Sequence, residues 1–235
     1  MADYLYNAAT KIKPPCRVFI VGPAQSGKTT LLVDLIKGYL ASLHQRIYAA
    51  SPTFDCQSTF DPIRKLIHPE DVYQNLNIKS MQLLIEKLQN KYKMAKKLGT
   101  TPEKALVFID DLAGNSCIHG KRQGAFAQFA TQCTWWNVTL IVLTQQPKAV
   151  DPNFRDNAEN IIILRDKGMD AFDWVRQAYT ALDQDKDLVR RVLLTAWQGG
   201  LGNNSEIGLH FLFIHAAPRG ETEFFIDFEK RINVA

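Results

Sequence analysis

Short apolar runs alternate with longer segments of helical periodicity along most of the 235-residue chain. The central positions of these runs are β-branched, aromatic or otherwise apolar, which predicts buried strands. The five runs are 16–22, 45–51, 104–110, 138–146 and 160–166. Strands without a polar face are typical of parallel sheets covered by helices on both sides. The pattern therefore predicts an α/β fold with a mainly parallel sheet flanked by helices.

Other segments place their apolar residues at the three- and four-residue spacing of amphipathic helices. These predicted helices are 28–43, 80–98, 124–133 and 170–197. Lys96 and Lys97 precede Gly99, as expected for the last turn of a helix. Near the end of the chain, two apolar runs flank the polar sequence PRGET and predict a C-terminal antiparallel hairpin.

The most informative loop is VGPAQSGKTT, residues 21–30, which matches G-x-x-x-x-G-K-[ST] between a predicted strand and a predicted helix. Gly22 and Gly27 permit the backbone angles of a phosphate cradle, and Lys28 is expected to bridge the outer phosphates. The expected cofactors are ATP and Mg2+, with the Thr29 hydroxyl as a metal ligand. The expected nucleotide-binding residues are Gly22, Pro23, Ala24, Gln25, Ser26, Gly27, Lys28, Thr29 and Thr30.

Two carboxylates follow the strand ALVFI, where a phosphate-splitting site needs an acid for the metal and a group for the attacking water. We assign Asp110 to the metal, together with Thr29, and Asp111 to the catalytic water. The alternative is that acids at a strand end are solvated turn residues. The phosphate loop upstream favours the catalytic interpretation.

Two further polar positions are candidates for catalysis. Gln145, with Gln146 in reserve, follows the strand 138–146 and could contact the terminal phosphate or the water. Arg155 could reach the nucleotide of a neighbouring subunit and stabilise transition-state charge. The alternative for Gln145 and Gln146 is that they only begin a turn before Pro147. The alternative for Arg155 is a surface ion pair.

Composition excludes few functions. The formal charge of +4 and the pI near 8.8 permit an anionic partner without requiring nucleic acid. The four cysteines form no C-x-x-C pair and the histidines no H-E-x-x-H, so we expect free, mostly buried thiols and no zinc site. The start of the chain lacks a signal-peptide pattern, and no apolar run reaches about 18 residues. We expect an intracellular protein without a transmembrane segment.

Basic side chains could line a path for a phosphate backbone, although a solvated helix face explains them equally simply. They are Lys87, Lys91, Lys93, Lys96, Lys97, His119, Lys121 and Arg122. Trp135 and Trp136 directly precede an apolar strand, which favours core or interface packing over stacking on bases.

The order of these motifs resembles that of the viral genome-packaging ATPases, the poxvirus-type and membrane-containing phage motors of the FtsK/HerA superfamily. The resemblance covers about residues 18–165 and includes SPTF after the second strand, FIDDLAG, the strand ending TQQ, and an R-D-N segment. It implies a P-loop NTPase with an additional-strand sheet, in which the strand ending at Gln145 lies between the loop strand and the acid strand.

The resemblance also implies roles and partners. The matching positions are Lys28 and Thr29 in the loop, Asp110 for the metal, Asp111 as catalytic acid, Gln145 as sensor and Arg155 in the R-x-N segment. Such proteins assemble as rings of five or six subunits at a capsid vertex and move double-stranded DNA inside, in the virion or host cytoplasm. The resemblance is also compatible with a contact to an inner viral membrane. It implies that no small molecule accepts the phosphate group.

One position departs from the pattern. Many relatives carry basic residues just before the sensor strand, where this chain has TQCTWWN. The arginine finger is therefore either Arg155 or Arg122.

We expect a single P-loop ATPase domain over residues 1–235. It comprises an N-terminal arm (1–15), a nucleotide-binding core (16–166) and a helix with the C-terminal hairpin (167–235). Three other functions share parts of this sequence pattern: a secretion or conjugation ATPase, a small-molecule kinase, and a scaffold that binds ATP without hydrolysing it.

Overall fold

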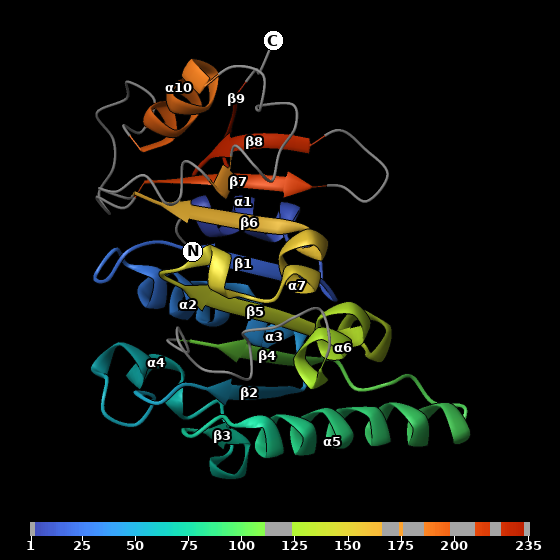
Figure 1. Ribbon diagram of the computed structural model, residues 1–235. Helices are drawn as coiled ribbons and strands as arrows, with labels where there is room; N and C mark the ends of the chain where they lie inside the picture. The colour runs from blue at the N-terminus through green and yellow to red at the C-terminus, as the bar shows by residue number, and fades with distance from the viewer. Residues whose placement is uncertain are drawn as a thin grey trace.

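A nine-stranded sheet forms the centre of the computed structural model, which describes residues 3–110, 124–165, 174–175, 186–197, 210–216 and 222–232. The strands are β1 Arg17–Val21, β2 Arg46–Ala50, β3 Val72–Tyr73, β4 Ala105–Ile109, β5 Val138–Thr144, β6 Asn160–Leu164, β7 Phe211–Ala216, β8 Thr222–Ile226 and β9 Lys230–Ile232. Their spatial order is β3-β2-β4-β5-β1-β6-β7-β8-β9 (Figure 1).

The strands from β3 to β6 in this order pair in parallel, and β7, β8 and β9 continue the sheet antiparallel. β5 lies between β1 and β4, which confirms the additional-strand arrangement. The α/β class and the antiparallel C-terminal hairpin are also confirmed. The strand β9, which the sequence pattern did not indicate, extends that hairpin.

Helices cover both faces of the sheet because alternate residues of each central strand point to opposite sides. In β1, Val18 and Ile20 belong to one buried cluster, whereas Phe19 and Val21 belong to the other. The helices α1 Asp3–Lys11 and α2 Lys28–Leu35 cover the first side. The second side is covered by α5 Ile78–Lys97, α6 Ala125–Gln132, α7 Pro152–Asn157 and α10 Lys186–Trp197 (Figure 1).

The predicted helix 28–43 is one continuous helical stretch of three parts. After α2, the backbone adopts π-helical bonding over Ile36–Leu40, and α3 Ala41–Leu43 completes the stretch. Tyr39 and Leu40 in this π-helical segment are buried. The spacing of apolar residues does not distinguish α-helical from π-helical bonding, because both place residues about four positions apart on the same side of the helix.

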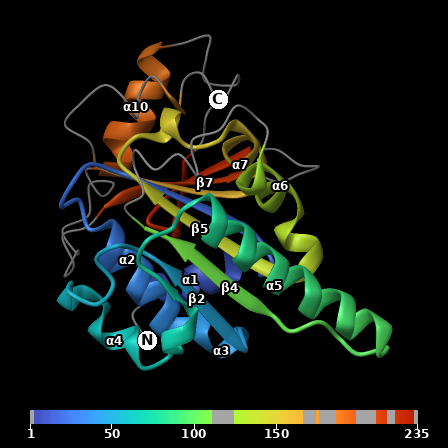
Figure 2. The same cartoon turned by 60° about the horizontal axis from the view of Figure 1, so that its bottom comes forward.

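The predicted helix 80–98 begins two residues earlier, at Ile78. Asn77 caps it: its Oδ1 accepts from the Ser80 backbone N at 3.0 Å, and its own N donates to Ser80 Oγ at 2.8 Å. This reciprocal pair satisfies two backbone donors at the helix start. The C-terminal end of α5 projects beyond the neighbouring elements (Figure 2).

The predicted N-terminal arm, residues 1–15, includes a helix that packs against the sheet. In α1, Ala8 and, just after the helix, Ile12 are buried against the sheet, and Lys11 Nζ lies 3.7 Å from the centre of the Phe225 ring. The short helices α4 Asp61–Arg64 and α7 are further elements that periodicity alone does not reveal. A helix of four to six residues offers too few turns for a pattern to be recognised.

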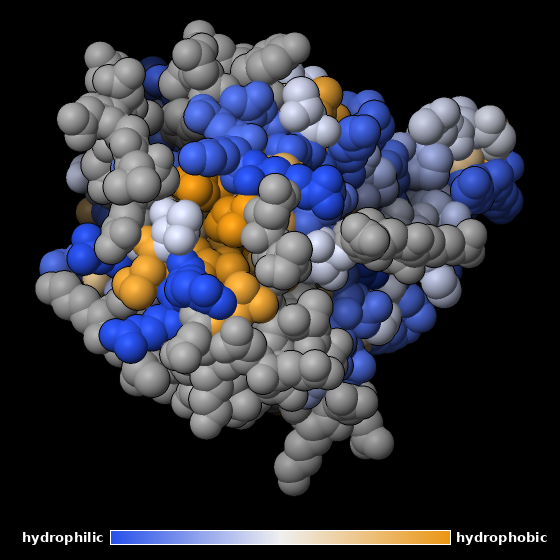
Figure 3. Space-filling view, turned by 90° about the horizontal axis from the view of Figure 1, so that it is seen from above, coloured by the Kyte–Doolittle hydropathy of each residue, from blue (hydrophilic) through white to orange (hydrophobic). Residues whose placement is uncertain are grey.

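Within the predicted helix 170–197, the described residues 174–175 and 186–197 are helical. The buried side of α10 includes Val189, Val192 and Leu193, and Trp197 Nε1 donates to the Ile163 carbonyl at 3.2 Å. On the face that carries α10, apolar side chains show between polar ones (Figure 3). Leu194 is among the exposed apolar residues of this helix. No helix in the described ranges has the length and apolar character needed to cross a bilayer.

The predicted buried thiols are confirmed at Cys16 and Cys133, whereas Cys56 is exposed and Cys117 lies outside the described residues. Burial raises the pKa of Cys133 to about 12, because an apolar surrounding disfavours the thiolate. Cys133 is therefore unreactive at neutral pH.

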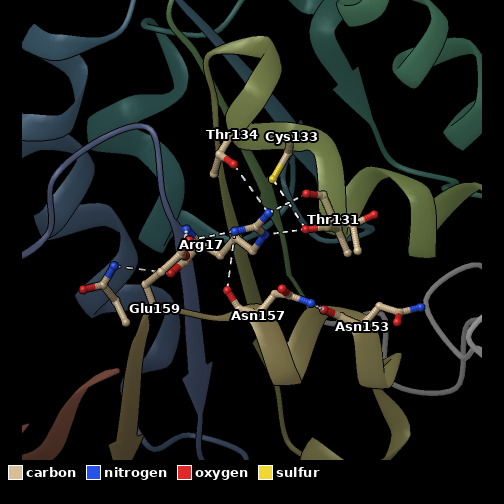
Figure 4. A network of polar contacts seen from close by, with 9 residues as sticks. Arg17, Thr131, Cys133, Thr134, Asn153, Asn157 and Glu159 are labelled. Atoms are coloured by element: carbon tan, nitrogen blue, oxygen red, sulfur yellow. Dashed lines mark hydrogen bonds and ion pairs between the residues drawn. The ribbon is translucent and has the colours of Figure 1, made fainter. Parts of the chain in front are cut away.

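A buried arginine ties the first residue of β1 to the ends of two helices (Figure 4). Arg17 is 6% exposed and forms an ion pair with Glu159 at 2.7 Å. The same guanidinium donates to the carbonyls of Ala130, Thr131 (2.7 Å) and Asn157 (3.5 Å). These carbonyls end α6 and α7, where the helix dipoles favour a cation.

We predict that Arg17→Met lowers the free energy of unfolding by about 3 kcal/mol, because it leaves Glu159 and the helix carbonyls without their partner. Equilibrium denaturation in urea measures the change. As a control, Lys91→Met removes the half-exposed Lys91–Glu103 pair (2.7 Å) and changes the stability by less than about 1 kcal/mol. Equal effects of the two substitutions would contradict the prediction.

His44 is buried between the helical stretch that starts with α2 and the strand β5. Its Nδ1 lies 2.7 Å from the Leu40 carbonyl and its Nε2 2.8 Å from the Thr139 hydroxyl. A carbonyl only accepts, so Nδ1 donates and, in the neutral ring, Nε2 accepts from Thr139. Burial lowers the pKa of His44 below its ordinary value of 6.5.

We predict that the stability falls as the pH drops below 6.5, because the unfolded chain then binds a proton at His44 that the folded chain resists. Above pH 6.5, where His44 is neutral in both the folded and the unfolded chain, its contribution to the free energy of unfolding is fully present. In His44→Gln, the free energy of unfolding should depend less steeply on pH between about 7 and about 5 than in the wild type. Parallel pH profiles of the two proteins, measured by chemical denaturation, would be inconsistent with this role.

Candidate nucleotide-binding site

The loop between β1 and α2 has the strained backbone that its sequence predicts. Gln25 and Gly27 adopt left-handed conformations, with φ of 58° and 92°. Gly27 precedes the first residue of α2, and its carbonyl accepts from the Leu31 N at 2.9 Å. The loop therefore leads directly into a helix N-terminus, where unpaired backbone amides and the helix dipole favour an anion.

Gly22 lies where a side chain has no room. Its backbone N donates to the Thr144 carbonyl at 3.2 Å, which holds the loop against β5. A Cβ at this position would lie 2.6 Å from Ser26 Oγ and 3.0 Å from the Leu164 Cβ. Ser26 Oγ is itself buried, and no group of the described chain forms a hydrogen bond with it. This hydroxyl is therefore available to a ligand within the loop.

Lys28 folds back onto the loop it follows. Its side chain is 8% exposed, and Nζ donates to the Pro23 carbonyl at 2.7 Å. The ammonium group thus lies over the loop that is predicted to hold the phosphates. A bound phosphate would compete with this carbonyl for the amine, since a charged acceptor forms the stronger hydrogen bond.

Thr29 and Asp110 come from distant parts of the chain and form a hydrogen bond. The Thr29 hydroxyl donates to Asp110 Oδ2 at 3.0 Å, although the two residues are 81 positions apart. Asp110 is 3% exposed, and its backbone N donates to the Ala50 carbonyl at 2.9 Å, as in a continuation of the β2–β4 pairing. The proposed metal ligands are therefore neighbours before any ligand binds.

These two side chains present hard oxygen donors, which suit Mg2+. Mg2+ in nucleotide sites is usually held by one or two protein groups together with phosphate oxygens and water, rather than by an all-protein cage. Accordingly, the described residues contain no group of three His, Cys, Asp or Glu side chains that could hold a metal ion without a nucleotide. The donor set fits a nucleotide-bound Mg2+.

Gln145 follows the last residue of β5, and that residue, Thr144, is paired with Val21 at the end of β1. Gln145 is exposed and lies at the sheet edge from which the phosphate loop starts. Gln146 is exposed as well, but its backbone N is held by the Thr144 hydroxyl at 3.0 Å. The structure thus places the predicted sensor beside the loop.

The loop after β2 brings further hydroxyl groups to this edge. Ser51 is fully buried, its Oγ lies 3.2 Å from Thr53 Oγ1, and Thr53 donates to Gln57 Oε1 at 3.0 Å. Since Ala50 is bonded to Asp110, these groups follow the strand next to the acid. The sequence pattern predicts no specific role for these hydroxyl groups. The available signal was that polar residues directly follow a predicted buried strand.

Arg155 is not part of this cluster. It lies on α7, whose Phe154 packs against Phe19 with ring centres 5.4 Å apart, on the opposite face of the sheet from α2. The end of α7 is bonded to Arg17 at the start of β1, whereas the phosphate loop follows the end of β1. Arg155 Nε is buried and makes no hydrogen bond in the described part of the chain.

Several predicted residues cannot be placed. Asp111, Arg122 and the basic loop 119–122 lie outside the described residues. On α5, Lys87 is paired with Asp71 (2.8 Å) and Lys91 with Glu103 (2.7 Å), which favours the solvated or structural interpretation for these two lysines. The remaining lysines near the end of α5 are exposed: Lys93, Lys96 and Lys97.

Solved structures of other proteins share this fold. The chain is similar to the genome packaging NTPase B204 from Sulfolobus turreted icosahedral virus 2 in complex with AMP, with a TM-score of 0.62 and 16% identity, over 92% of this chain and 98% of that one. The complex of B204 with ATP-gammaS matches over the same shares with a TM-score of 0.59 and 16% identity.

The pCW3 conjugation coupling protein TcpA is also similar, with a TM-score of 0.56 and 14% identity over 90% of this chain and 60% of that one. EssC from Geobacillus thermodenitrificans, ATPases 2 and 3, matches with a TM-score of 0.51 and 17% identity, over 67% of this chain and 34% of that one. At these identities the similarity establishes the fold and leaves the cargo open.

Sequence comparison identifies the family. Among curated protein sequences, none matches this chain. The family model described as "Poxvirus A32 protein" matches residues 4–196, a range that includes most of α1, the phosphate loop, Asp110, Gln145 and Arg155. The matched range covers more than four fifths of the 235 residues, and the chain therefore belongs to the Poxvirus A32 protein family.

Proposed function

We propose that the chain is an ATP-hydrolysing motor that translocates double-stranded DNA into a viral capsid. In this proposal residues 1–235 act as one P-loop ATPase domain, and several copies assemble as a ring of five or six subunits at a capsid vertex. The observation that carries the proposal is the hydrogen bond of 3.0 Å between Thr29 and Asp110. It joins the phosphate loop to the acid strand across the inserted strand β5.

The residues at this edge of the sheet supply the groups that phosphate hydrolysis needs. The loop amides, Lys28 and the Ser26 hydroxyl bind the phosphates, and Thr29 and Asp110 are the protein ligands for Mg2+. When bound, Mg2+ neutralises charge on the phosphate oxygens. Asp111 orients or deprotonates the attacking water, and Gln145 senses the terminal phosphate.

Membership of the Poxvirus A32 protein family and the similarity to B204, named as a genome packaging NTPase, both support DNA packaging. The structures of B204 with AMP and ATP-gammaS support adenine nucleotides as ligands. A small-molecule acceptor is not expected, so the phosphate group is transferred to water.

A conjugation or secretion ATPase is the second candidate, because TcpA and EssC share the fold. The hydrolytic site would be the same in both cases, and only the cargo would differ. Family membership favours packaging. Stimulation by double-stranded DNA also separates packaging from protein secretion, while a preference for a protein substrate would favour secretion.

In the proposed ring, Arg155 completes the site of a neighbouring subunit. On its own chain it lies on the opposite face of the sheet from α2, at α7. Its Nε is buried and has no hydrogen-bond partner among the described residues. Arg122 stays the alternative finger.

We predict that the purified chain releases inorganic phosphate from ATP, that long double-stranded DNA stimulates this activity, and that the stimulation falls between about 50 and about 200 mM salt. Lys28→Ala should lower kcat at least about 100-fold, because it removes a cation from the developing negative charge. Steady-state phosphate release measures both effects.

The matched control is Lys37→Ala, which removes an exposed lysine from the helical stretch that follows the loop. It should leave the hydrolysis rate unchanged. Transfer of phosphate to a small acceptor without any DNA response would instead identify a kinase. If Lys28→Ala hydrolyses ATP as fast as the wild type, the phosphate loop has no part in the reaction and the proposal is wrong.

We predict that Arg155→Ala lowers kcat on the order of 1,000-fold, and that mixing Arg155→Ala with Lys28→Ala subunits restores part of the activity. In such mixed assemblies, an intact loop of one subunit meets an intact arginine of the next. ATPase titrations of one variant with the other measure the recovery.

Arg190→Ala, which changes an exposed arginine on α10, serves as the control and should be as active alone as the wild type. A mixture that stays inactive at every ratio would show that Arg155 acts within its own chain. Arg122→Ala would then be tested in the same way.

A further inference from the structure

Three polar side chains after β2 form a chain of hydrogen bonds at the edge of the sheet that carries the phosphate loop. Ser51, the first residue after β2, is fully buried, and its Oγ lies 3.2 Å from Thr53 Oγ1. Thr53 Oγ1 donates to Gln57 Oε1 at 3.0 Å, and the Thr53 backbone N donates to Ser51 Oγ at 3.3 Å. None of the three is a nucleotide or metal ligand in the proposed function.

The strand register places Ser51 beside Asp110. β2 and β4 pair in parallel as far as Ala50 and Ile109. The Asp110 backbone N then donates to the Ala50 carbonyl at 2.9 Å, so Ser51 and Asp110 are the next neighbours along the two strands. Neighbouring strands of a sheet lie about 4.8 Å apart. The buried hydroxyl therefore belongs to a residue directly next to the proposed metal ligand.

Ser51 and Asp110 also point to the same face of the sheet, because side chains alternate between the two faces along a strand. In β4, Phe108 belongs to the buried cluster on the α2 side. Asp110, two residues later, points to that side as well, where it accepts from Thr29. In β2, Ala49 belongs to the same cluster, and Ser51 is two residues after it.

The loop that carries the chain is held by apolar packing. Phe54 and Phe60 are buried with ring centres 5.0 Å apart, and their centres lie 6.2 Å and 5.9 Å from that of Phe108. The 3-10 helix η2 Ser58–Phe60 contacts α2. The loop is therefore anchored both to the acid strand and to the helix that follows the phosphate loop. This packing fixes the place of Ser51 beside Asp110.

The chain also sets the direction of its hydrogen bonds. An amide oxygen only accepts, so the hydroxyl proton of Thr53 goes to Gln57 Oε1. In the contact between the two hydroxyl groups, Ser51 is then the donor and Thr53 the acceptor. A hydroxyl oxygen has two acceptor positions, and on Ser51 the Thr53 backbone N occupies one of them. No donor among the described residues occupies the other.

We infer that Ser51 is a positioning residue of the metal centre, whose Oγ accepts a hydrogen bond from a water ligand of the nucleotide-bound Mg2+. The inference rests on the proposed function, in which Thr29 and Asp110 are the protein ligands. Mg2+ in nucleotide sites usually keeps several waters, and the protons of these waters need acceptors. Thr53 and Gln57 keep the proton of Ser51 turned away from Asp110, so the hydroxyl does not compete with the metal for the carboxylate.

The test is Ser51→Ala in the full chain. Calorimetric titration with ATP-gammaS, once with Mg2+ and once with EDTA, gives two Kd values. The ratio of the Kd in EDTA to the Kd in Mg2+ measures what the metal adds to nucleotide binding. We expect this ratio to fall about 10-fold in Ser51→Ala, because loss of a group that orients metal ligands weakens metal binding. The Kd in EDTA should stay that of the wild type, since the phosphate loop is unchanged.

A second pair of variants tests the direction of the chain. Thr53→Val removes the acceptor of the Ser51 proton, which can then turn to Asp110, so the ratio should also fall. Thr53→Ser keeps the hydroxyl and should match the wild type. The matched control is Ser58→Ala, which changes an exposed serine of the same loop and should leave the ratio unchanged.

The failure of this inference can be distinguished from that of the proposed function. If Mg2+ tightens ATP-gammaS binding to the wild type and to Ser51→Ala by the same factor, the inference is wrong while the motor proposal stands. If Mg2+ does not change the wild-type affinity, the metal site in the proposed function fails, and this inference fails with it. Equal losses of affinity with Mg2+ and with EDTA, or unfolding of both Ser51→Ala and Thr53→Val in thermal denaturation, would assign the chain a structural role and overturn the inference.

Discussion

The central position of β1 is the constraint on which the rest of the structure depends. It pairs in parallel with β5 on one side and β6 on the other, so its direction and register are fixed from both sides. The two ends of β1 have different roles. Its carboxyl end supplies the phosphate loop, and its first residue, Arg17, binds the C-terminal carbonyls of α6 and α7. Changing the pairing of β1 would displace the site and its supports together.

The nucleotide site is organised before a ligand binds. Lys28 is held by the Pro23 carbonyl and Thr29 by Asp110, so polar groups that would otherwise be buried without partners are satisfied by the protein. Nucleotide binding then exchanges one set of hydrogen bonds for another, which limits the reorganisation that accompanies binding. The exception is the Ser26 hydroxyl, which is buried and has no hydrogen-bond partner among the described residues. Parallel strands make this arrangement accessible, because their carboxyl ends meet at one edge of the sheet.

The proposed assembly follows from the same asymmetry. The phosphate loop and Arg155 lie at different places on the sheet, the loop after the last residue of β1 and Arg155 on α7, on the opposite face from α2. In the ring that we propose, Arg155 is the residue that links hydrolysis in one subunit to the position of the next. Arg17, which is buried and paired with Glu159, also donates to the Asn157 carbonyl and so ties the end of α7 to the start of β1.

Local sequence by itself determined the strands, the longer helices and the phosphate loop. The spacing of apolar residues and the positions of glycines are patterns that can be read within a few neighbouring residues. The order of β5 between β1 and β4 came from the resemblance to a family, since no local pattern records which strands pair. Only the tertiary structure decided that Thr29 meets Asp110, that Arg155 lies across the sheet from α2, and that Trp135 is exposed beside a buried Trp136. Those facts depend on contacts between residues far apart in the chain, and adjacent tryptophans look alike until the packing around each is known.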